Sequence, residues 1–488
     1  MSYQSPTTPM PHQTEALERI ASRPSLPAPT NVFALLLDMG TGKSKIICDE
    51  WGASDFRNLI VIAPAGSYAN WWMDRPEKPS ELRAHLDPRL WEQGLTVAPW
   101  ISGGGKHQRD AISRLLRARG RRVLVVNVEA LSTVERAVDA CLALASEGPT
   151  MCVVDESTRI RNPSASRTKA VIKIGSHCQA RRIATGLVAP RSPLDVFSQY
   201  QFLDQRILGF NNYYAFRARY AVVEKKLMRG RHVPIVVGHR NVDELWQKMA
   251  PYSFRKRLED CIRMPPKIYS MRTVELTSEQ RRVYCEMRDD AISRIGEYFA
   301  SSTLAITTML RLQQILCGFV TTESGEIVKL PSNRDAEVVR ILDEHRGKAI
   351  IWTAFDQSVR SIRDLLAREF GERSVATFWG GNRATRLEEE SRFLSDTECK
   401  YMISTPQSGG LGNTWVVATL AIYHSNTYSL EDREQSEKRP YRRGQDKTVN
   451  IVDLVARGTL DEKVIKALRS KQEIAATIQG ERVRDWLI

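Results

Sequence analysis

The 488-residue sequence is short of the features that mark several large classes of protein. Its eight cysteines are scattered, with no C-x-x-C pair and no Cys/His cluster at zinc spacing. A disulfide framework and a structural zinc site are therefore not expected, and reduced thiols in a cytosolic compartment are the simplest account. No apolar run approaches the roughly 18 residues that a membrane-spanning helix needs. No internal repeat, heptad array or low-complexity tract is present.

The composition is typical of a globular protein, with 42% hydrophobic and 26% charged residues. A chain of this length is too long for one hydrophobic core and predicts two to four domains. Lys and Arg number 71 against 57 Asp and Glu, which gives a formal charge of +14 and a pI near 9.4. This excess favours a polyanionic partner, and the alternative is a basic protein without one. Residues 1–13 lack the apolar core of a signal peptide and predict a short polar arm.

Residues 33–45, FALLLDMGTGKSK, form the stretch around which the chain is organised. An apolar run of strand character ends at Leu37, a glycine turn follows, and Ile46 begins a segment of helical character. This order is the context of a phosphate-binding loop, whose backbone N–H groups close around phosphate oxygens. Lys43 would reach the β and γ phosphates, and the Ser44 hydroxyl would hold Mg²⁺. Leu37 stands where the usual pattern has a glycine, so an ordinary strand-to-helix turn is the alternative.

Short apolar runs alternate with amphipathic stretches at both ends of the chain, which predicts parallel α/β sheets with helices on both faces. The strand candidates begin near residues 33, 59, 123, 151 and 182, and again near 348, 374, 401, 419 and 449. Helical segments are expected at HQRDAISRLLRARG, SASRTKAVIKIG and QSVRSIRDLLAREF. Two α/β units therefore bracket a middle, residues 204–331, that has few strand signals. In it, residues 278–316 predict long helices, and Pro265-Pro266 marks a crossing between the units.

The middle also holds a run in which cationic and aromatic side chains alternate, NYYAFRARYAVVEKKLMRGRH at 212–232. Cations for phosphates and rings for stacking are what a nucleic-acid surface requires. The alternative is a solvated helical face whose tyrosines belong to the core. The candidate DNA contacts are Arg217, Arg219, Lys225, Lys226, Arg229 and Arg231.

Two further groups of charged residues predict phosphoryl-transfer chemistry. Asp155 and Glu156 leave a buried strand, where the Asp can complete a Mg²⁺ shell and the Glu can polarise the attacking water. Arg439 and Arg442 lie three apart between two apolar strands, and a pair of guanidinium groups can neutralise charge on a transferring phosphoryl group. Paired acids at a strand end and a solvated basic run are the respective alternatives.

The chain resembles a superfamily-two helicase-type ATPase of the Swi/Snf DNA translocase family, in particular a minimal viral or bacterial member. Pro11-His12-Gln13 is similar to the glutamine motif of that family and DMGTGKSK to its phosphate loop. NLIVIAPAGSYANWW, VVDESTRIRNPSASRTKA and RIATGLVAPRSPLDVFSQYQFL resemble motifs Ia, II and III. AIIWTAFDQSV, ISTPQSGGLGNTW and EQSEKRPYRRGQDKTVNIVDLVARGTLDEKV resemble motifs IV, V and VI. The motifs follow the family's order from residue 11 to about 470.

The resemblance implies an α/β fold with two RecA-like parallel-sheet lobes and helical insertions, and it implies ATP and Mg²⁺ as cofactors. It divides the chain into a first lobe over 1–203, a helical protrusion over 204–250, a linker and helical insertion of the second lobe over 251–331, the second lobe over 332–470 and a helical tail over 471–488. Its catalytic residues are Lys43, Glu156, Arg439 and Arg442. Its nucleotide contacts are Gln13, Met39, Gly40, Thr41, Gly42, Lys43 and Ser44. Its metal-binding residues are Ser44 and Asp155, and its coupling residues are Thr185, Gly186, Gly409, Gly410 and Gln435.

The sequence departs from the family where nucleotide state is relayed to the DNA path. Motif II has Ser157-Thr158 where Ala-His is usual, and motif III has Leu187 where a Thr is usual. These departures put the efficiency of coupling in doubt more than hydrolysis itself.

The leading hypothesis is a DNA-stimulated ATPase that translocates on double-stranded DNA, held mostly through its phosphates, and remodels DNA structures or DNA-bound proteins. A strand-separating or branch-migrating helicase is the alternative; a strand-splitting hairpin in the second unit would favour it, and none is evident from the sequence. A nucleotide-gated DNA-binding module without turnover is the second alternative. The chain is expected to act as a monomer, in the cytoplasm or wherever DNA is housed, neither secreted nor in a membrane, and a protein partner is left open.

Overall fold

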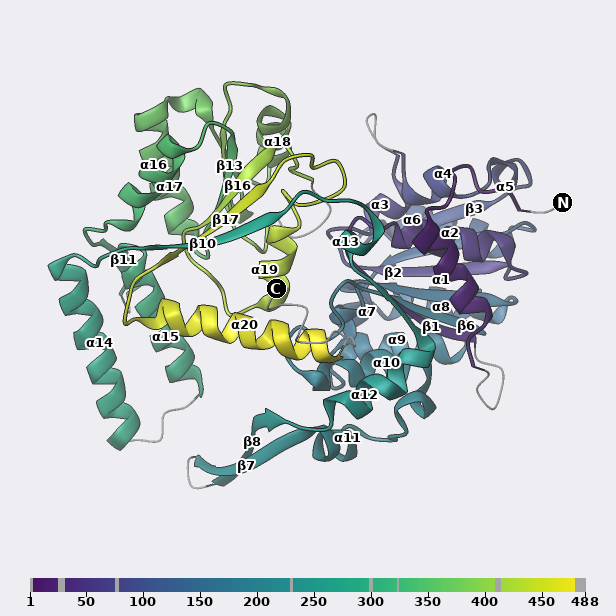
Figure 1. Ribbon diagram of the computed structural model, residues 1–488. Helices are drawn as coiled ribbons and strands as arrows, with labels where there is room; N and C mark the ends of the chain where they lie inside the picture. The colour runs from purple at the N-terminus through teal and green to yellow at the C-terminus, as the bar shows by residue number, and fades with distance from the viewer. Residues whose placement is uncertain are drawn as a thin grey trace. The chain divides into compact units, whose positions relative to one another are not determined.

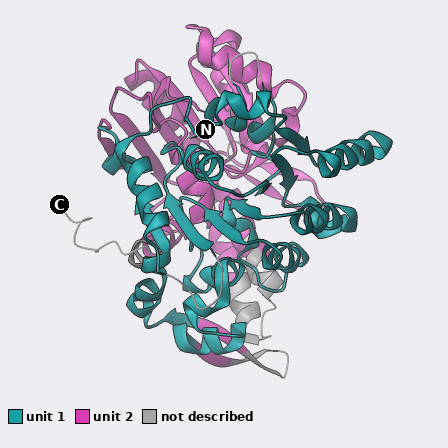
Figure 2. Cartoon of the chain, turned by 90° about the vertical axis from the view of Figure 1, so that its right-hand side faces the viewer, with its two compact units in different colours: residues 1–222, 237–263, 473–488 teal, residues 223–236, 264–472 magenta. Residues whose placement is uncertain are grey.

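The computed structural model describes residues 3–24, 31–74, 79–228, 231–297, 302–322, 324–408 and 414–478. The chain forms two compact units, which Figure 2 shows in different colours. Unit 1 comprises residues 1–222, 237–263 and 473–488, and unit 2 comprises residues 223–236 and 264–472. The chain thus passes between the units directly before Pro265-Pro266.

Unit 1 is built on a seven-stranded parallel sheet of order β3-β4-β2-β5-β6-β1-β9. Its strands are β1 (Asn31–Leu37), β2 (Asn58–Ala63), β3 (Thr96–Pro99), β4 (Arg122–Asn127), β5 (Thr150–Asp155), β6 (Ala180–Ala184) and β9 (Ser253–Lys256). Its helices are α1 (Pro11–Ala21), α2 (Lys43–Ala53), α3 (Ala69–Trp72), α4 (Glu81–His85), α5 (Pro88–Glu92), α6 (Gly105–Arg117), α7 (Ala130–Thr133), α8 (Glu135–Ser146), α9 (Ser166–Ser176), α10 (Val196–Leu208), α11 (Tyr213–Tyr220), α12 (Val242–Met249) and α13 (Leu258–Cys261). Figure 1 shows helices on both faces of this sheet, as strands buried on both faces require.

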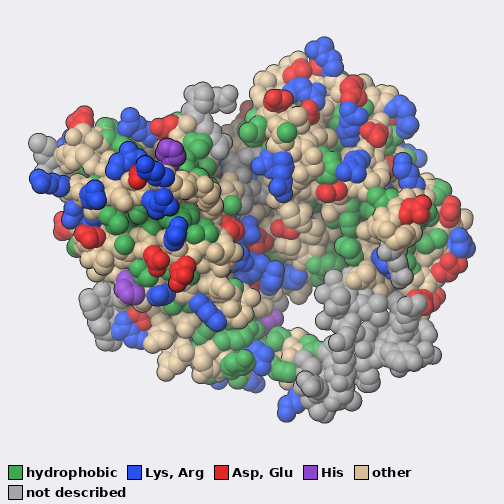
Figure 3. Space-filling view, turned by 180° about the vertical axis from the view of Figure 1, so that it is seen from behind, with side chains coloured by type: hydrophobic (Ala, Val, Ile, Leu, Met, Phe, Trp, Pro, Cys, Tyr) green, Lys and Arg blue, Asp and Glu red, His purple; other side chains and the backbone are tan. Residues whose placement is uncertain are grey.

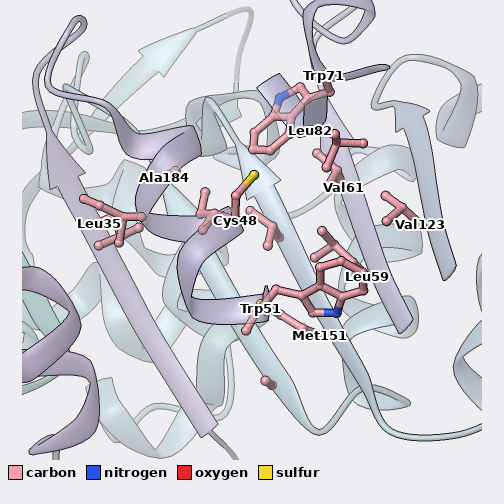
Figure 4. Close-up of a cluster of buried hydrophobic side chains, with 14 of the residues drawn as sticks. Leu35, Cys48, Trp51, Leu59, Val61, Trp71, Leu82, Val123, Met151 and Ala184 are labelled. Atoms are coloured by element: carbon pink, nitrogen blue, oxygen red, sulfur yellow. The ribbon is translucent and has the colours of Figure 1, made fainter. Parts of the chain in front are cut away.

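The core of unit 1 lies between the sheet and α2. β1, β2 and β5 are almost entirely apolar and buried, so their side chains fill both faces of the sheet. From α2, Ile46, Ile47, Cys48 and Trp51 pack against the strands, as Figure 4 shows for Cys48 and Trp51. Burial of each such side chain is worth about 1.5–3 kcal/mol, which fixes the helix that follows the glycine turn.

Unit 2 is built on a six-stranded parallel sheet of order β10-β17-β16-β13-β15-β14. Its strands are β10 (Lys267–Thr273), β13 (Lys348–Trp352), β14 (Val375–Phe378), β15 (Tyr401–Ser404), β16 (Ala418–Tyr423) and β17 (Val449–Val455). Its helices are α14 (Ser278–Glu297), α15 (Ser302–Leu316), α16 (Arg334–Glu344), α17 (Asp356–Phe370), α18 (Arg386–Ser395), α19 (Leu430–Glu437) and the start of α20 (Leu460–Ile478). All ten strands predicted from apolar runs are present in the two sheets, and α6, α9 and α17 match the predicted helices.

The middle of the chain contains more strand than the sequence predicts. Helices α14 and α15 confirm the long helices expected over residues 278–316. The expectation of few strands is wrong, because β9 extends the first sheet and β10 extends the second. Two small antiparallel sheets add β7 (Ala221–Met228) with β8 (Arg231–His239), and β11 (Phe319–Thr321) with β12 (Ile327–Lys329). The segment over 204–250, expected to be helical, therefore carries a β-hairpin between α11 and α12.

The remaining sequence-wide expectations concern thiols and membranes. All eight cysteines are free. Across the described ranges, none of the helices is both long and apolar enough to cross a membrane.

Candidate active site

Three loops of unit 1 meet at one edge of its sheet. The strands are parallel, so the carboxyl ends of β1, β6 and β5 lie at the same edge, and β6 pairs with both of the others. The loops that follow them carry the glycine turn, Thr185 and Asp155. A Cβ atom placed on Gly186 would lie 3.4 Å from the carbonyl oxygen of Leu37, so the β6 loop packs directly on the start of the glycine turn.

The glycine turn has the backbone conformation that a phosphate cradle needs. Gly40 has φ +86° and Gly42 has φ +82°, a region that residues with a Cβ rarely adopt. The side-chain amide of Gln13 donates to the carbonyl oxygen of Thr41 at 3.0 Å, and His12 Nε2 lies 2.7 Å from the same oxygen. A Cβ on Gly42 would come within 2.2 Å of Gln13 Nε2. Gln13, expected at the nucleotide, thus also holds the turn itself.

Lys43 is the first residue of α2, and its side chain folds back into the turn. Its ammonium group donates to the carbonyl oxygens of Leu37 at 2.9 Å and Asp38 at 3.2 Å. Ser44 follows in the first turn of the helix, where the positive end of the helix dipole favours anions. Met39 lies half-buried in the turn, and the Thr41 hydroxyl donates to the Asp38 carbonyl at 2.7 Å. The turn therefore places a cation and a helix start at one point.

Asp155 ends β5 and is buried beside Glu156. Burial first, and the negative charge of Glu156 second, raise the pKa of Asp155 to about 6, while Lys43 and a hydrogen bond from Trp71 act in the opposite direction. Glu156 has φ +48°, and its N–H donates to Asp155 Oδ1 at 3.1 Å. Such strain at a non-glycine residue costs about 1–3 kcal/mol and is common at functional sites. Burial and the charge of Glu156 thus outweigh the stabilisation that Lys43 and Trp71 give to the ionised carboxylate of Asp155.

The loop after β6 contacts Glu156, and hydrogen bonds connect it to Ser157, one of the residues at which motif II departs from the family. Thr185 donates from Oγ1 to Glu156 Oε2 at 3.4 Å. The hydroxyl of Ser157, which stands where the family has Ala, donates to Gln199 Oε1 at 2.6 Å. The amide of Gln199, a residue of α10, donates in turn to the carbonyl oxygen of Val188 at 2.6 Å. Gln199 was not singled out from the sequence, and it bridges the two motifs that depart from the family.

Arg439 and Arg442 lie in unit 2, on the loop between α19 and β17. Arg439 is fully buried, and its carbonyl oxygen accepts from the N–H of Trp415 at 3.0 Å. Arg442 is half-buried and donates from Nη1 to Thr414 Oγ1 at 3.2 Å. The side-chain amide of Gln445 donates to the carbonyl oxygens of Val416 and Pro440, so it joins the segment after Trp415 to the loop that carries the two arginines. The expected arginine pair is therefore bonded to the last two residues of motif V, Thr414 and Trp415.

A buried charge network fixes α19, the helix that carries Gln435 and precedes the arginine pair. Arg433 donates to Glu437 Oε1 at 2.6 Å and to Asp453 at 2.5 Å, with its guanidinium carbon 3.5 Å from the Tyr423 ring centroid. Burial by itself raises the pKa of Glu437, but the charges of Arg433 and Lys267, with the hydrogen bonds from Arg433 and Tyr269, together lower that pKa. Removing one member of such a buried pair typically costs about 3–5 kcal/mol. Gly409 and Gly410, expected to couple motif V, lie outside the described residues.

The structure leaves some of the expected DNA contacts exposed and pairs others with neighbouring side chains. Arg217 lies 5.6 Å from the ring centroid of Tyr214, which is 73% exposed. Arg219 instead donates to Glu244 at 3.1 Å, and Lys225 is exposed on β7. The rings of Phe216 and Tyr220 are core, as the alternative interpretation of this run holds. Lys226 and Arg231 lie in β7 and β8, and Arg229 lies outside the described residues.

The residues at the edge of the first sheet fit a nucleotide and Mg²⁺. A single Cβ at Gly42 would clash with the side chain of Gln13, and the Lys43 side chain already lies within the turn. In the part of the chain that the structure describes, no group of three His, Cys, Asp or Glu side chains could hold a metal ion by itself. Mg²⁺ is usually bound by one or two protein groups together with phosphate oxygens. Ser44 and Asp155 would supply that set. The fold and these loops are those of a two-lobed, RecA-like protein with a candidate nucleotide site.

Comparison with known proteins identifies the family to which the chain is similar. The SNF2-related domain family model matches residues 31–318, more than half of the chain. An uncharacterized ATP-dependent helicase of Mycoplasma pneumoniae is 25% identical over 338 residues, 68% of this chain and 31% of its own. The DNA annealing helicase and endonuclease ZRANB3 of Mus musculus is 22% identical over 92% of this chain and 40% of its own. The chain therefore spans less than half the length of these relatives.

The solved structure of a Sulfolobus solfataricus SWI2/SNF2 ATPase core in complex with dsDNA is 19% identical, with a TM-score of 0.40, over 98% of this chain and 96% of that one. On the family match, the chain belongs to the SNF2-related domain family. The family resemblance, the α/β fold with two RecA-like lobes and the enzyme class expected from the sequence are confirmed. Trp71, whose indole donates to Asp155, is a site residue that the sequence did not reveal.

Proposed function

We propose that the chain is an ATP-driven motor that translocates on double-stranded DNA and remodels DNA structures or DNA-bound proteins. One observation carries the proposal: the glycine turn, the Asp155-Glu156 pair and Thr185 converge at the carboxyl edge of one sheet, within a chain of the SNF2-related family. Relatives named ATP-dependent helicases, and one named a DNA annealing helicase, support it.

The chemistry follows from where these side chains lie. Lys43 would exchange its carbonyl partners for phosphate oxygens, which are stronger acceptors because they are charged. Ser44 and Asp155 would hold Mg²⁺, which withdraws charge from the β and γ phosphates. Glu156 would orient and deprotonate the attacking water. Thr185 is hydrogen-bonded to Glu156, so a movement of Glu156 during the reaction would be transmitted to the loop after β6.

The arginine pair of unit 2 is proposed to complete this site. Motors with two lobes gain force when each lobe supplies part of the charge that stabilises the transition state. Arg439→Ala or Arg442→Ala should then leave nucleotide binding nearly intact and lower turnover by about 10³-fold. Lys43→Ala should weaken binding itself. Normal turnover in both arginine variants would remove unit 2 from the chemistry.

DNA is proposed to bind mainly through its phosphates. Figure 3 shows Lys and Arg side chains spread over the visible face with Asp and Glu between them, and the chain carries a net charge of +14. Contacts of this kind supply affinity with little base readout. Binding should fall steeply as salt rises and should hardly depend on sequence, so a strong preference for one sequence at moderate salt would contradict it.

The test is phosphate release measured with duplex, single-stranded, forked and RNA substrates, combined with displacement of a triplex-forming third strand. A duplex translocase is stimulated most by duplex DNA and displaces the third strand, but it unwinds a simple tailed duplex poorly. Four-way or forked junctions would still be remodelled, because movement on one arm exchanges pairs without net melting. Robust unwinding of a tailed duplex without triplex displacement would contradict the proposal.

The β7–β8 hairpin favours one alternative, a strand-separating or branch-migrating helicase. Strand separation needs an element that enters between the strands, and the two-stranded β7–β8 sheet would be a candidate for that role. A nucleotide-gated binding module is the remaining alternative, and an absence of phosphate release with every nucleic acid would favour it. A reducing, DNA-containing location and a monomeric state stay predictions.

A further inference from the structure

The carboxylate of Asp155 receives a hydrogen bond from the indole of a tryptophan. Trp71 Nε1 donates to Asp155 Oδ2 at 3.0 Å, while the N–H of Glu156 donates to Oδ1 at 3.1 Å. Each carboxylate oxygen is thus engaged by one donor that cannot itself accept a proton. Together the two donors fix the plane of the carboxylate and leave its other lone pairs for a cation.

The position of the indole is set by packing. Trp71 is 2% exposed and belongs to the core of unit 1, and Figure 4 shows its ring among Leu82, Val61 and Cys48. Because the ring is held on its apolar side, its N–H has a fixed direction. A rigid donor restricts the carboxylate more strongly than a flexible Lys or Ser side chain would.

Trp71 also connects two different parts of the sheet edge. It lies in α3, in the segment that follows β2, whereas Asp155 ends β5, and β2 and β5 are paired neighbours. The hydrogen bond therefore spans the loops after two adjacent strands. A displacement of α3 would turn the indole N–H away and release the carboxylate.

We infer that Trp71 is a positioning residue for the metal-binding carboxylate, and that through it the segment after β2 controls how tightly the site holds Mg²⁺ with nucleotide. This rests on the proposed function, because it presupposes that Asp155 faces Mg²⁺. Partners of this kind orient a ligand without touching the metal, and their loss typically weakens metal affinity about 10-fold to 100-fold. The effect is directed at the metal and not at the nucleotide.

The test uses the full chain and measures binding of a fluorescent ADP analogue by anisotropy, with Mg²⁺ and in its absence with EDTA. Trp71→Phe keeps a buried ring and removes the N–H. The expected result is a loss of at least about 10-fold in the contribution of Mg²⁺ to binding, with Mg²⁺-free binding unchanged. Electron paramagnetic resonance of Mn²⁺ in the same complex should show matching weaker metal binding.

Trp100→Phe is the matched control. Trp100 is also buried in unit 1, and its indole N–H has no hydrogen-bond partner among the described residues, so its loss should leave the Mg²⁺ contribution unchanged. If Trp71→Phe fails to fold, benzothienylalanine at position 71 replaces only the N–H by sulfur and serves instead. An unchanged Mg²⁺ contribution in the folded variant would overturn the inference. A wild-type protein that binds nucleotide without any effect of Mg²⁺ would overturn the metal assignment first, which separates the two failures.

Discussion

The guanidinium of Arg442 donates to the hydroxyl of Thr414, with 3.2 Å between Nη1 and Oγ1. The next residue, Trp415, donates its backbone N–H to the carbonyl oxygen of Arg439. Trp415 is itself fully buried, stacked on Trp352 with ring centroids 5.5 Å apart. A two-residue segment anchored in the core of unit 2 is therefore bonded to both members of the arginine pair.

Thr414→Val should lower turnover without weakening nucleotide binding. Valine keeps the shape of threonine and removes the acceptor, so Arg442 loses a partner that restricts its long side chain. A fall of about 10-fold in kcat corresponds to the loss of one hydrogen bond to a charged group. Thr419→Val is the matched control, because Thr419 bonds His345 elsewhere in unit 2. Equal kcat values for the two variants would show that Thr414 does not position Arg442.

Ser157→Ala should destabilise unit 1 and reduce stimulation by DNA, although Ala is the residue that the wider family has. The substitution leaves Gln199 Oε1 buried without its donor, which typically costs about 1–3 kcal/mol. It also removes the link between the loops after β5 and β6. Thermal unfolding and the ratio of DNA-stimulated to basal phosphate release measure the two effects. A variant with higher stability and unchanged stimulation would show that the departure is neutral.

The sequence predicts ten strands of the two parallel sheets well because each is a short apolar run that is mostly buried. It does not predict β9 or β10, since SFRK and KIYSMRT carry no such run. These segments are strands because β1 and β17 offer them free edges, a long-range cause that local pattern cannot express. The β7–β8 hairpin, whose two strands pair with each other, is missed for a different reason: the family resemblance assigns residues 204–250 to a helical protrusion.

The candidate site divides in a similar way. Local spacing is enough to predict the glycine turn, because the geometry of the turn depends on adjacent residues. The role of Trp71 depends on the pairing of β2 with β5, and that of Gln199 on the packing of α10 behind two loops. The only sequence signal for the role of Trp71 is the pair of tryptophans after β2. A single sequence does not distinguish an indole that only packs in the core from one whose N–H also donates a hydrogen bond.

Gly42→Ala should weaken nucleotide binding because it displaces the Gln13 side chain in addition to straining the backbone. A Cβ at this position would lie 2.2 Å from Gln13 Nε2, and φ is +82°. Gly103 has φ +81° with nothing within 4 Å of its Cβ position, so Gly103→Ala isolates the strain, about 1–2 kcal/mol. Isothermal titration with ADP and Mg²⁺ should show binding weakened only in the first variant. Equal losses in both would assign the effect to strain alone.

Unit 2 contains a buried histidine whose charge depends on its surroundings. His424, fully buried after β16, lies with Nε2 2.9 Å from Asp335 Oδ1. Burial by itself lowers its pKa, but the hydrogen bond that His424 donates to Asp335 and the neighbouring Cys317 outweigh burial and raise the pKa to about 9. His424 is thus protonated at neutral pH. The guanidinium of Arg334 holds the backbone at this point by donating to the carbonyl oxygen of His424.

The stability of unit 2 should therefore fall as pH rises from 7 to 10. A histidine with a raised pKa contributes stability that is complete below its unfolded value of about 6.5 and is lost as pH passes its folded value of about 9. The loss should be roughly 1–3 kcal/mol, or on the order of 5 °C in Tm. His424→Gln can still donate to Asp335 but does not titrate, so it should have a lower Tm at pH 7 and a flatter profile up to pH 10. Differential scanning calorimetry of both proteins across this range makes the comparison, with Asp335→Asn as a second variant that should also flatten the profile. Parallel Tm curves for wild type and His424→Gln would assign the alkaline instability to other groups.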